Sequence, residues 1–178
     1  MAGIDKRLLR SIYEAFASRN ARRMRKLNDK VLNSLIISGE KEAISLAIIT
    51  YALSKILSKR KFGDKKYNKH MDHIEQILLK MSENGEVSIG VGEVKKELVE
   101  MESKDPRYIF SLITKSKVKM AATLYAKGMS LSSVVKLFGI AKEEVLSYAG
   151  KTMMFDRVKE EVPVKKRVEE ILSFVGVE

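Results

Sequence analysis

Apolar residues recur along nearly the whole chain at the three- and four-residue spacing of an amphipathic helix, and no segment alternates like a β-strand. The first stripe consists of Ile4, Leu8, Ile12 and Phe16. The third predicted helix is apolar nearly all round, a pattern typical of a helix enclosed by its neighbours. The four predicted helices cover residues 4–17, 21–37, 41–59 and 65–81. The pattern therefore predicts an all-α protein with an N-terminal helical bundle over residues 1–82.

A glycine-rich segment, SENGEVSIGVGEV at residues 82–94, holds three of the ten glycines and predicts a linker. An acidic helix over residues 93–102 follows it, so residues 83–105 separate the bundle from the rest. Asp105 and Pro106 are typical of a helix start. The helix that follows runs to Gly128 with a predicted break near Ser116, and a last helix covers Val164–Phe174. Residues 106–178 thus form a C-terminal helical region, unless both regions share one continuous core.

The segment MSLSSVVKLFGIAKEEVLSYA, residues 129–149, has the apolar spacing of a helix-turn-helix. Gly139 divides it into two short amphipathic helices, which must bury a small shared core where they cross. Apolar residues stand at suitable offsets from the glycine: Val134, Phe138, Ile140, Val145 and Tyr148. A helix over residues 116–127 offers Met120, Leu124 and Tyr125 to the same core. With Ser130 as a helix cap, the pattern predicts a trihelical helix-turn-helix region whose motif covers residues 130–150.

In this interpretation the second helix of the motif enters the major groove of duplex DNA. The residues predicted to face the bases are Ala141, Lys142, Glu143, Leu146 and Ser147. The residues predicted to contact phosphates are Ser132, Ser133, Lys136 and Lys151, with Lys127 as a further candidate.

Two features depart from the usual DNA-binding pattern. Val135 stands four residues before the glycine, where alanine is usual. Glu143 and Glu144 bring carboxylates to DNA, where they help only by accepting a hydrogen bond from cytosine or by orienting a basic side chain. A three-helix unit that only packs, or that binds protein, is the alternative.

The net charge of +11 is concentrated in the N-terminal half, where residues 1–80 carry 18 Lys and Arg against 8 Asp and Glu. Positive charge of this kind attracts polyanions through counterion release. A second basic surface is predicted on the polar side of the second helix: Arg19, Arg22, Arg23, Lys26 and Lys30. A solvated helix face is the alternative, because a high Lys and Glu content without cysteine is also typical of heat-adapted proteins.

Candidate chemistry is sparse. The chain has no cysteine and only two histidines, His70 and His73. With Asp72 they suggest a metal site, but His70 lies in an apolar stripe and no second ligand cluster accompanies it, so a core or boundary histidine is favoured and no metal is expected. No serine or carboxylate pair stands with a histidine in a recognisable catalytic pattern. We therefore expect a noncatalytic protein without cofactors.

The residues SLSSVVKLFGIAKEEVLSYAGKT, preceded by a Lys-rich helical region that contains AIITYALSKI, resemble archaeal proteins of similar length described as predicted helix-turn-helix transcriptional regulators. The specific part of the resemblance covers Ser130–Thr152. It implies a DNA-binding domain in the C-terminal half.

Compartment and partners follow from the same features. MAGIDKRLLR carries charges too early for a signal peptide, and the longest uncharged stretch, Ala43–Ser54, is too short to span a bilayer, so we expect a cytoplasmic protein without membrane contact. The expected partner is double-stranded DNA, bound by a homodimer because one recognition helix reads few base pairs. The alternatives are an RNA-binding or ribonucleoprotein-associated protein that uses the basic N-terminal bundle, and a protein-interaction adaptor.

Overall fold

A computed structural model describes residues 4–38, 41–103 and 109–157. The described residues are almost all helical and contain no strand, so the predicted all-α class is confirmed. None of the described helices is long and apolar enough to cross a membrane. The predicted helix start at Asp105 and Pro106 and the predicted last helix, Val164–Phe174, lie outside the described residues.

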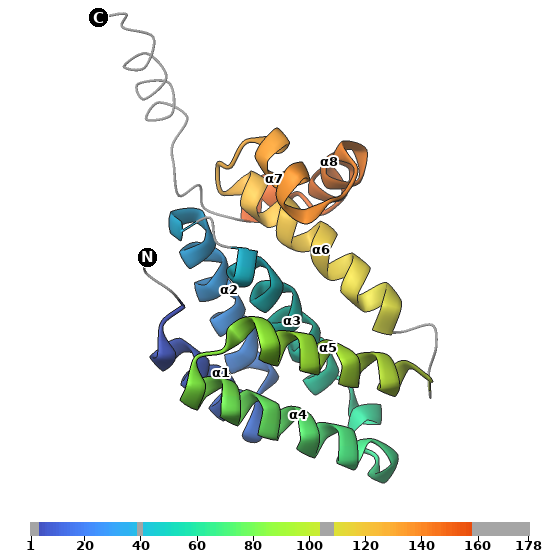
Figure 1. Ribbon diagram of the computed structural model, residues 1–178. Helices are drawn as coiled ribbons and strands as arrows, with labels where there is room; N and C mark the ends of the chain where they lie inside the picture. The colour runs from blue at the N-terminus through green and yellow to red at the C-terminus, as the bar shows by residue number, and fades with distance from the viewer. Residues whose placement is uncertain (1–3, 39–40, 104–108, 158–178) are drawn as a thin grey trace, which may run out of the picture. The chain divides into compact units, whose positions relative to one another are not determined.

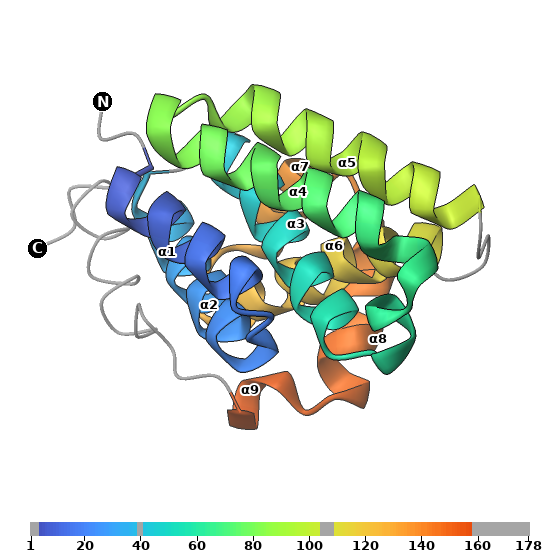
Figure 2. The same ribbon diagram turned by 90° about the horizontal axis from the view of Figure 1, so that it is seen from below.

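The chain divides into two compact units, Met1–Ser116 and Lys117–Glu178, called here the N-terminal and C-terminal units. The division falls inside a single helix, α6, and not at the linker predicted near residue 82. That helix is continuous through Ser116, where a break was predicted, and the Ser116 hydroxyl donates a hydrogen bond of 2.6 Å to the carbonyl of Leu112 one turn earlier. The helices of the two units are drawn in Figures 1 and 2.

The described residues of the N-terminal unit form five α-helices, a short 3-10 helix, η1, and the first part of α6. α2 packs on α3, α1 packs on α4, and α5 packs on both α4 and α3. As its apolar sequence predicted, α3 is buried almost all round. The bounds are α1 Lys6–Ala17, α2 Ala21–Ser38, α3 Lys41–Leu57, η1 Arg60–Gly63, α4 Lys65–Asn84 and α5 Val87–Ser103.

Hydrogen bonds from polar side chains fix the start of α1 and the packing of α2 on α3. The carboxylate of Asp5 caps α1 by accepting from the backbone N–H of Arg7. Inside the unit, the buried Asn28 side chain of α2 donates to the carbonyl of Ala47 at 2.6 Å and to the hydroxyl of Thr50 at 2.9 Å, both on α3. Because a buried amide must find partners, these bonds favour one alignment of α2 along α3.

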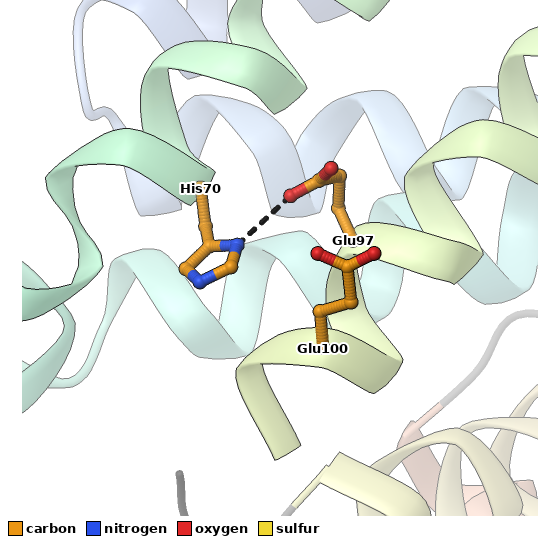
Figure 3. A group of neighbouring side chains, drawn as sticks. All are labelled: His70, Glu97 and Glu100. Atoms are coloured by element: carbon orange, nitrogen blue, oxygen red, sulfur yellow. Dashed lines mark hydrogen bonds and ion pairs between the residues drawn. The ribbon is translucent and has the colours of Figure 1, made fainter. Parts of the chain in front are cut away.

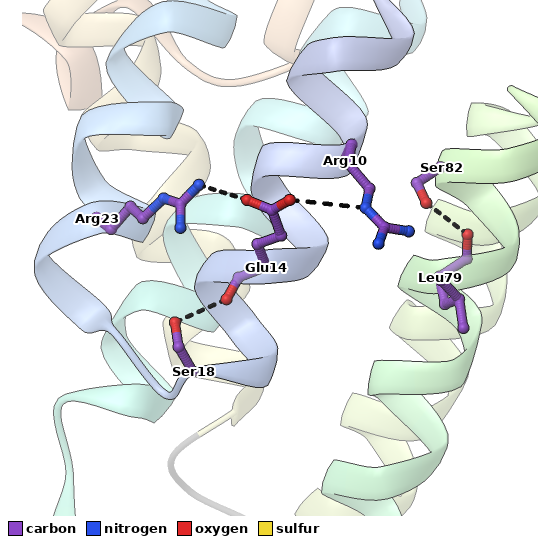
Figure 4. Close-up of polar contacts among 6 residues, drawn as sticks. All are labelled: Arg10, Glu14, Ser18, Arg23, Leu79 and Ser82. Atoms are coloured by element: carbon purple, nitrogen blue, oxygen red, sulfur yellow. Dashed lines mark hydrogen bonds and ion pairs between the residues drawn. The ribbon is translucent and has the colours of Figure 1, made fainter.

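Glu14 forms one surface ion pair between α1 and α2 and a second one within α1. Glu14 of α1 accepts from Arg23 of α2 at 2.7 Å and lies 3.6 Å from Arg10 (Figure 4). In the same view, the hydroxyls of Ser18 and Ser82 bond back to carbonyls of their own helices. The pairs are exposed, so each contributes at most about 1 kcal/mol.

The prediction of a linker over residues 82–94 is wrong, because α5 begins at Val87 and only Gly85 and Glu86 separate it from α4. Gly85 ends α4 in the left-handed conformation, at φ 79°. Gly90 is required by the close packing of α5 on α4 and not by a flexible linker. A Cβ on Gly90 would lie 2.9 Å from the sulfur of Met81 and 3.1 Å from the Cβ of Met81. The glycine thus lets α5 approach α4 closely, and the predicted acidic helix over residues 93–102 is the second half of α5.

Tyr67 of α4 is fully buried, and its hydroxyl has no hydrogen-bond partner among the described residues. An unsatisfied buried hydroxyl costs free energy, whereas the ring itself packs against Phe62 at a centroid distance of 5.0 Å. We therefore expect Tyr67→Phe to raise the free energy of unfolding by about 1 kcal/mol. Urea denaturation followed by circular dichroism measures this change, and a loss of stability would show that the hydroxyl has a partner.

Over its described residues, 117–157, the C-terminal unit contains the second part of α6, whose full range is Ile109–Ala126, and three shorter helices. α8 packs on α7 (Figure 1) and also contacts α9. The bounds are α7 Leu131–Phe138, α8 Lys142–Lys151 and α9 Met154–Arg157. The side chains expected to form this core are buried in most cases: Met120, Leu124, Val134, Phe138 and Val145 are buried, while Tyr125, Ile140 and Tyr148 are half-buried.

Candidate nucleic-acid interface

α7 and α8, residues 131–151, are called here the α7–α8 pair. A serine begins it: the Ser130 hydroxyl caps α7 by accepting from the N–H of Ser133 at 3.1 Å. Gly139 ends α7 in the left-handed conformation, at φ 60° and ψ 46°, and its N–H donates to the carbonyl of Val135 at 3.0 Å. Three residues, 139–141, therefore separate an eight-residue helix from a ten-residue helix.

The glycine at the turn has a conformational role. Nothing lies within 4 Å of a Cβ placed on Gly139, so its positive φ, and not crowding, accounts for the residue type. Val135, where alanine is usual in the DNA-binding pattern, is only half-buried, so part of its side chain lies at the surface. The larger residue is thereby accommodated without full burial between the helices.

The residues predicted to contact DNA are exposed, except the further candidate Lys127, which is half-buried. Along α8, Lys142, Glu143, Leu146 and Ser147 recur at helical spacing and share one face, while Val145 and Ala149 are buried. Ala141 stands just before this face as the N-cap residue and provides no side-chain hydrogen bond to the helix. The exposed residues predicted to contact phosphates are Ser132, Ser133 and Lys136 on α7 and Lys151 at the end of α8.

The electrostatics of the α7–α8 pair are mixed but positive on balance. Residues 117–157 carry seven Lys and Arg against three Asp and Glu. Glu143 and Glu144 lie in the first turn of α8, where carboxylates interact favourably with the helix dipole. Their position gives them a role in helix stability that needs no contact with DNA. Leu146, at 40% exposure, adds an apolar contact point on the same face.

The second predicted basic surface is exposed, but part of its charge is paired within the protein. Arg19 lies 3.4 Å from Glu75 and 3.8 Å from Asp72 of α4. Arg23 is bound to Glu14, as described above. Arg22, Lys26 and Lys30 are exposed on α2.

Positive charge also gathers where α2 approaches the end of α3. Burial, together with the positive charges of Arg25 and Lys59, holds the pKa of Lys55 below its usual range. Arg19, Lys59 and Arg60 line an open cavity of about 360 Å³ in the N-terminal unit. Neither Tyr67 nor His70 lines this cavity, so it is separate from the histidines.

A partly buried polar cluster, not predicted from the sequence, lies between α4 and α5. His70 Nδ1 is 2.9 Å from Glu97 Oε2, and His73 Nδ1 is 2.5 Å from Glu97 Oε1. Burial alone would raise the pKa of Glu97, but the hydrogen bonds and positive charges of the two histidines outweigh it and lower the pKa. Asp72 points elsewhere, toward Arg19.

His70 is a buried helix residue, as predicted, whereas His73 is exposed. The expectation that no second set of ligands accompanies His70 is wrong. A second set of possible ligands exists, because Glu97 and Glu100 of α5 lie beside His70. The three-residue spacing of Glu97 and Glu100 could have indicated a second set of ligands. Their alignment with His70, however, depends on how α5 packs on α4.

The α7–α8 pair combines an exposed helix face with nearby lysines, and the α4–α5 contact combines imidazole with carboxylates. The first arrangement suits a phosphate backbone and the second suits protons or cations. No protein-family model, curated protein or solved structure matches the chain.

Proposed function

We propose that the protein binds double-stranded DNA through the α7–α8 pair and acts as a noncatalytic transcriptional regulator. The observation that supports this most strongly is the left-handed Gly139 in a three-residue turn between two short helices, with the outer face of α8 exposed. This local geometry suits a recognition helix, because its exposed face can enter the major groove while the preceding helix crosses the backbone.

The chemistry of the exposed face suits limited sequence readout supported by phosphate contacts. Lys142 at the start of α8 provides a donor for guanine, and Leu146 offers an apolar surface to a thymine methyl group. Lys136 and Lys151 lie in the last turns of the two helices, and their charge suits contacts with phosphates. A symmetric dimer with two α8 helices about 34 Å apart would double the base pairs that are read.

Charge reversal at the α7–α8 pair tests this proposal. We expect Lys136→Glu with Lys142→Glu to weaken binding of a random-sequence duplex about 100-fold at low salt and to reduce the slope of log affinity against log salt by about 2. Both lysines are exposed, so the helices should form normally in the variant. Fluorescence anisotropy of a labelled duplex over a salt series measures both quantities, and sedimentation of the complex gives its stoichiometry.

The matched control reverses two exposed charges of α2, Arg22→Glu with Lys26→Glu. Arg23 is left in place because its loss would also break the ion pair with Glu14. The control should weaken duplex binding only in part. A larger loss in the control, or tighter binding of RNA at equal salt, would favour an RNA-binding protein that uses the N-terminal unit. The absence of nucleic-acid affinity would favour a protein-interaction adaptor.

A further inference from the structure

Four side chains capable of metal coordination meet at the contact between α4 and α5. His70 and His73 are three residues apart on α4, and Glu97 and Glu100 are three residues apart on α5, so each pair lies on one face of its helix. The ligand atoms of His70, Glu97 and Glu100 all lie within 4.8 Å of one another (Figure 3). His73 contacts the second oxygen of Glu97.

We propose that His70, Glu97 and Glu100 bind one divalent transition-metal ion, with Zn²⁺ as the representative ion, and that His73 positions the Glu97 carboxylate. An imidazole with two carboxylates suits the first-row metals, whereas Mg²⁺ and Ca²⁺ favour sites made of oxygen alone. The two carboxylates match the charge of the dication. This site is independent of the proposed DNA contact.

The geometry requires only small movements. Zinc bonds of about 2.0–2.2 Å at the tetrahedral angle place neighbouring ligand atoms about 3.3–3.6 Å apart. His70 Nδ1 and Glu97 Oε2 are already 2.9 Å apart and both come from buried side chains, so two ligands are held in place by the packing of α4 on α5. Glu100 is exposed and its carboxylate lies within 4.8 Å of the other two ligand atoms, so a rotation of its side chain would bring it to the ion.

Metal binding replaces the hydrogen bond between His70 and Glu97. For a neutral ring this is a change of tautomer: Nδ1 releases its proton and Nε2 takes one up, so the imidazole stays neutral. The Nδ1 lone pair and the Glu97 oxygen then both bind the ion. The hydrogen bond from His73 to Glu97 Oε1 remains and fixes the carboxylate, a role that outer partners of metal ligands commonly have. The ion would cross-link α4 to α5 through residues that lie inside both helices and not in the turn between them.

The chain itself makes a sensitive experiment possible. It contains no cysteine and only these two histidines, so an untagged chain offers a transition metal no thiolate and no other imidazole. The full chain is freed of metal with a chelator and titrated with Zn²⁺ by calorimetry and with Co²⁺ by visible absorption. We expect one ion per chain and no comparable binding of Mg²⁺.

Variants distinguish ligands from the positioning residue. Glu100→Gln and His70→Gln should each weaken Zn²⁺ binding at least about tenfold and change the Co²⁺ spectrum. His73→Gln should weaken binding while the positions of the Co²⁺ bands stay the same, because the ligand set is unchanged. Glu93→Gln, an exposed carboxylate of α5 outside the cluster, is the matched control and should bind as the unsubstituted chain does.

Failure of the folded chain to bind one Zn²⁺ would overturn the proposal. Equal affinities for the unsubstituted chain, Glu100→Gln and His70→Gln would overturn it as well, and would leave the cluster as an ion-pair network. If His70→Gln does not fold, Glu100→Gln decides the question, since Glu100 is exposed. None of these measurements contains DNA, so their outcome is separate from that of the proposed function.

Discussion

Asn28→Asp is expected to lower the free energy of unfolding of the N-terminal unit by about 3–5 kcal/mol. The side chain is only 3% exposed, and its amide nitrogen donates to the Ala47 carbonyl and the Thr50 hydroxyl. The Thr50 hydroxyl already donates to the carbonyl of Leu46, so it meets Asn28 as an acceptor. A carboxylate has no hydrogen to donate and would place a buried negative charge against these acceptors.

Urea denaturation of the variant measures this loss. Burial raises the folded-state pKa of a carboxyl group above its unfolded value of about 3.9, so the loss should be full at neutral pH and should diminish as the pH falls toward about 4. Asn20→Asp makes the same chemical change at an exposed position, where the side-chain oxygen accepts from the N–H of Arg23 at 2.9 Å. Aspartate keeps that acceptor at the start of α2, so the control should change stability by less than about 0.5 kcal/mol. Similar losses in both variants would contradict the bridging role of Asn28.

Phe138→Ala should destabilise the C-terminal unit by about 3–5 kcal/mol. Phe138 ends α7 and is 5% exposed, in a small unit whose buried side chains include Val134 and Val145. Removing a ring from such a core leaves a cavity that few neighbouring side chains can fill. Thermal unfolding and binding of duplex DNA, measured on the same sample, should both reveal the loss.

Phe155→Ala is the matched control, because this ring is 55% exposed on α9 and stacks edge-on against Tyr125 at 5.2 Å. Its removal should cost about 0.5–1.5 kcal/mol. Should Phe155→Ala prove as damaging as Phe138→Ala, the core of the C-terminal unit would be centred on α9 and not on the α7–α8 pair.

Helix boundaries were the most predictable part of the fold, because they depend on short-range patterns. The predicted helix over residues 21–37 is Ala21–Ser38 in the structure, and the predicted helix over residues 65–81 is Lys65–Asn84. In the C-terminal unit the position of Gly139 fixed the turn correctly, since a left-handed residue at a helix end strongly favours glycine.

The start of α5 was not predictable from residue types. Gly90 is a poor helix former, and beside Gly85 and Gly92 it indicated a linker. A glycine is needed at position 90 because of Met81, which lies nine residues earlier and comes close only after α5 has packed on α4. For the same reason the meeting of His70 with Glu97 could not be predicted, because it depends on how two helices align and not on the spacing within either.

The packing of α1 on α4 also has a consequence for the order of folding during synthesis. Lys6 near the start of α1 donates to the carbonyl of Glu83 near the end of α4, a contact across 77 positions, whereas α2 packs on the helix that directly follows it. Distant contacts form late because a long loop must close first. On the ribosome, α2 and α3 can therefore pair soon after they emerge, whereas α1, which also contacts α2, lacks the larger part of its packing until α4 has been made. The buried residues of α1, among them Leu9, Ile12 and Phe16, are then incompletely covered during that interval, and such apolar side chains are what chaperones bind.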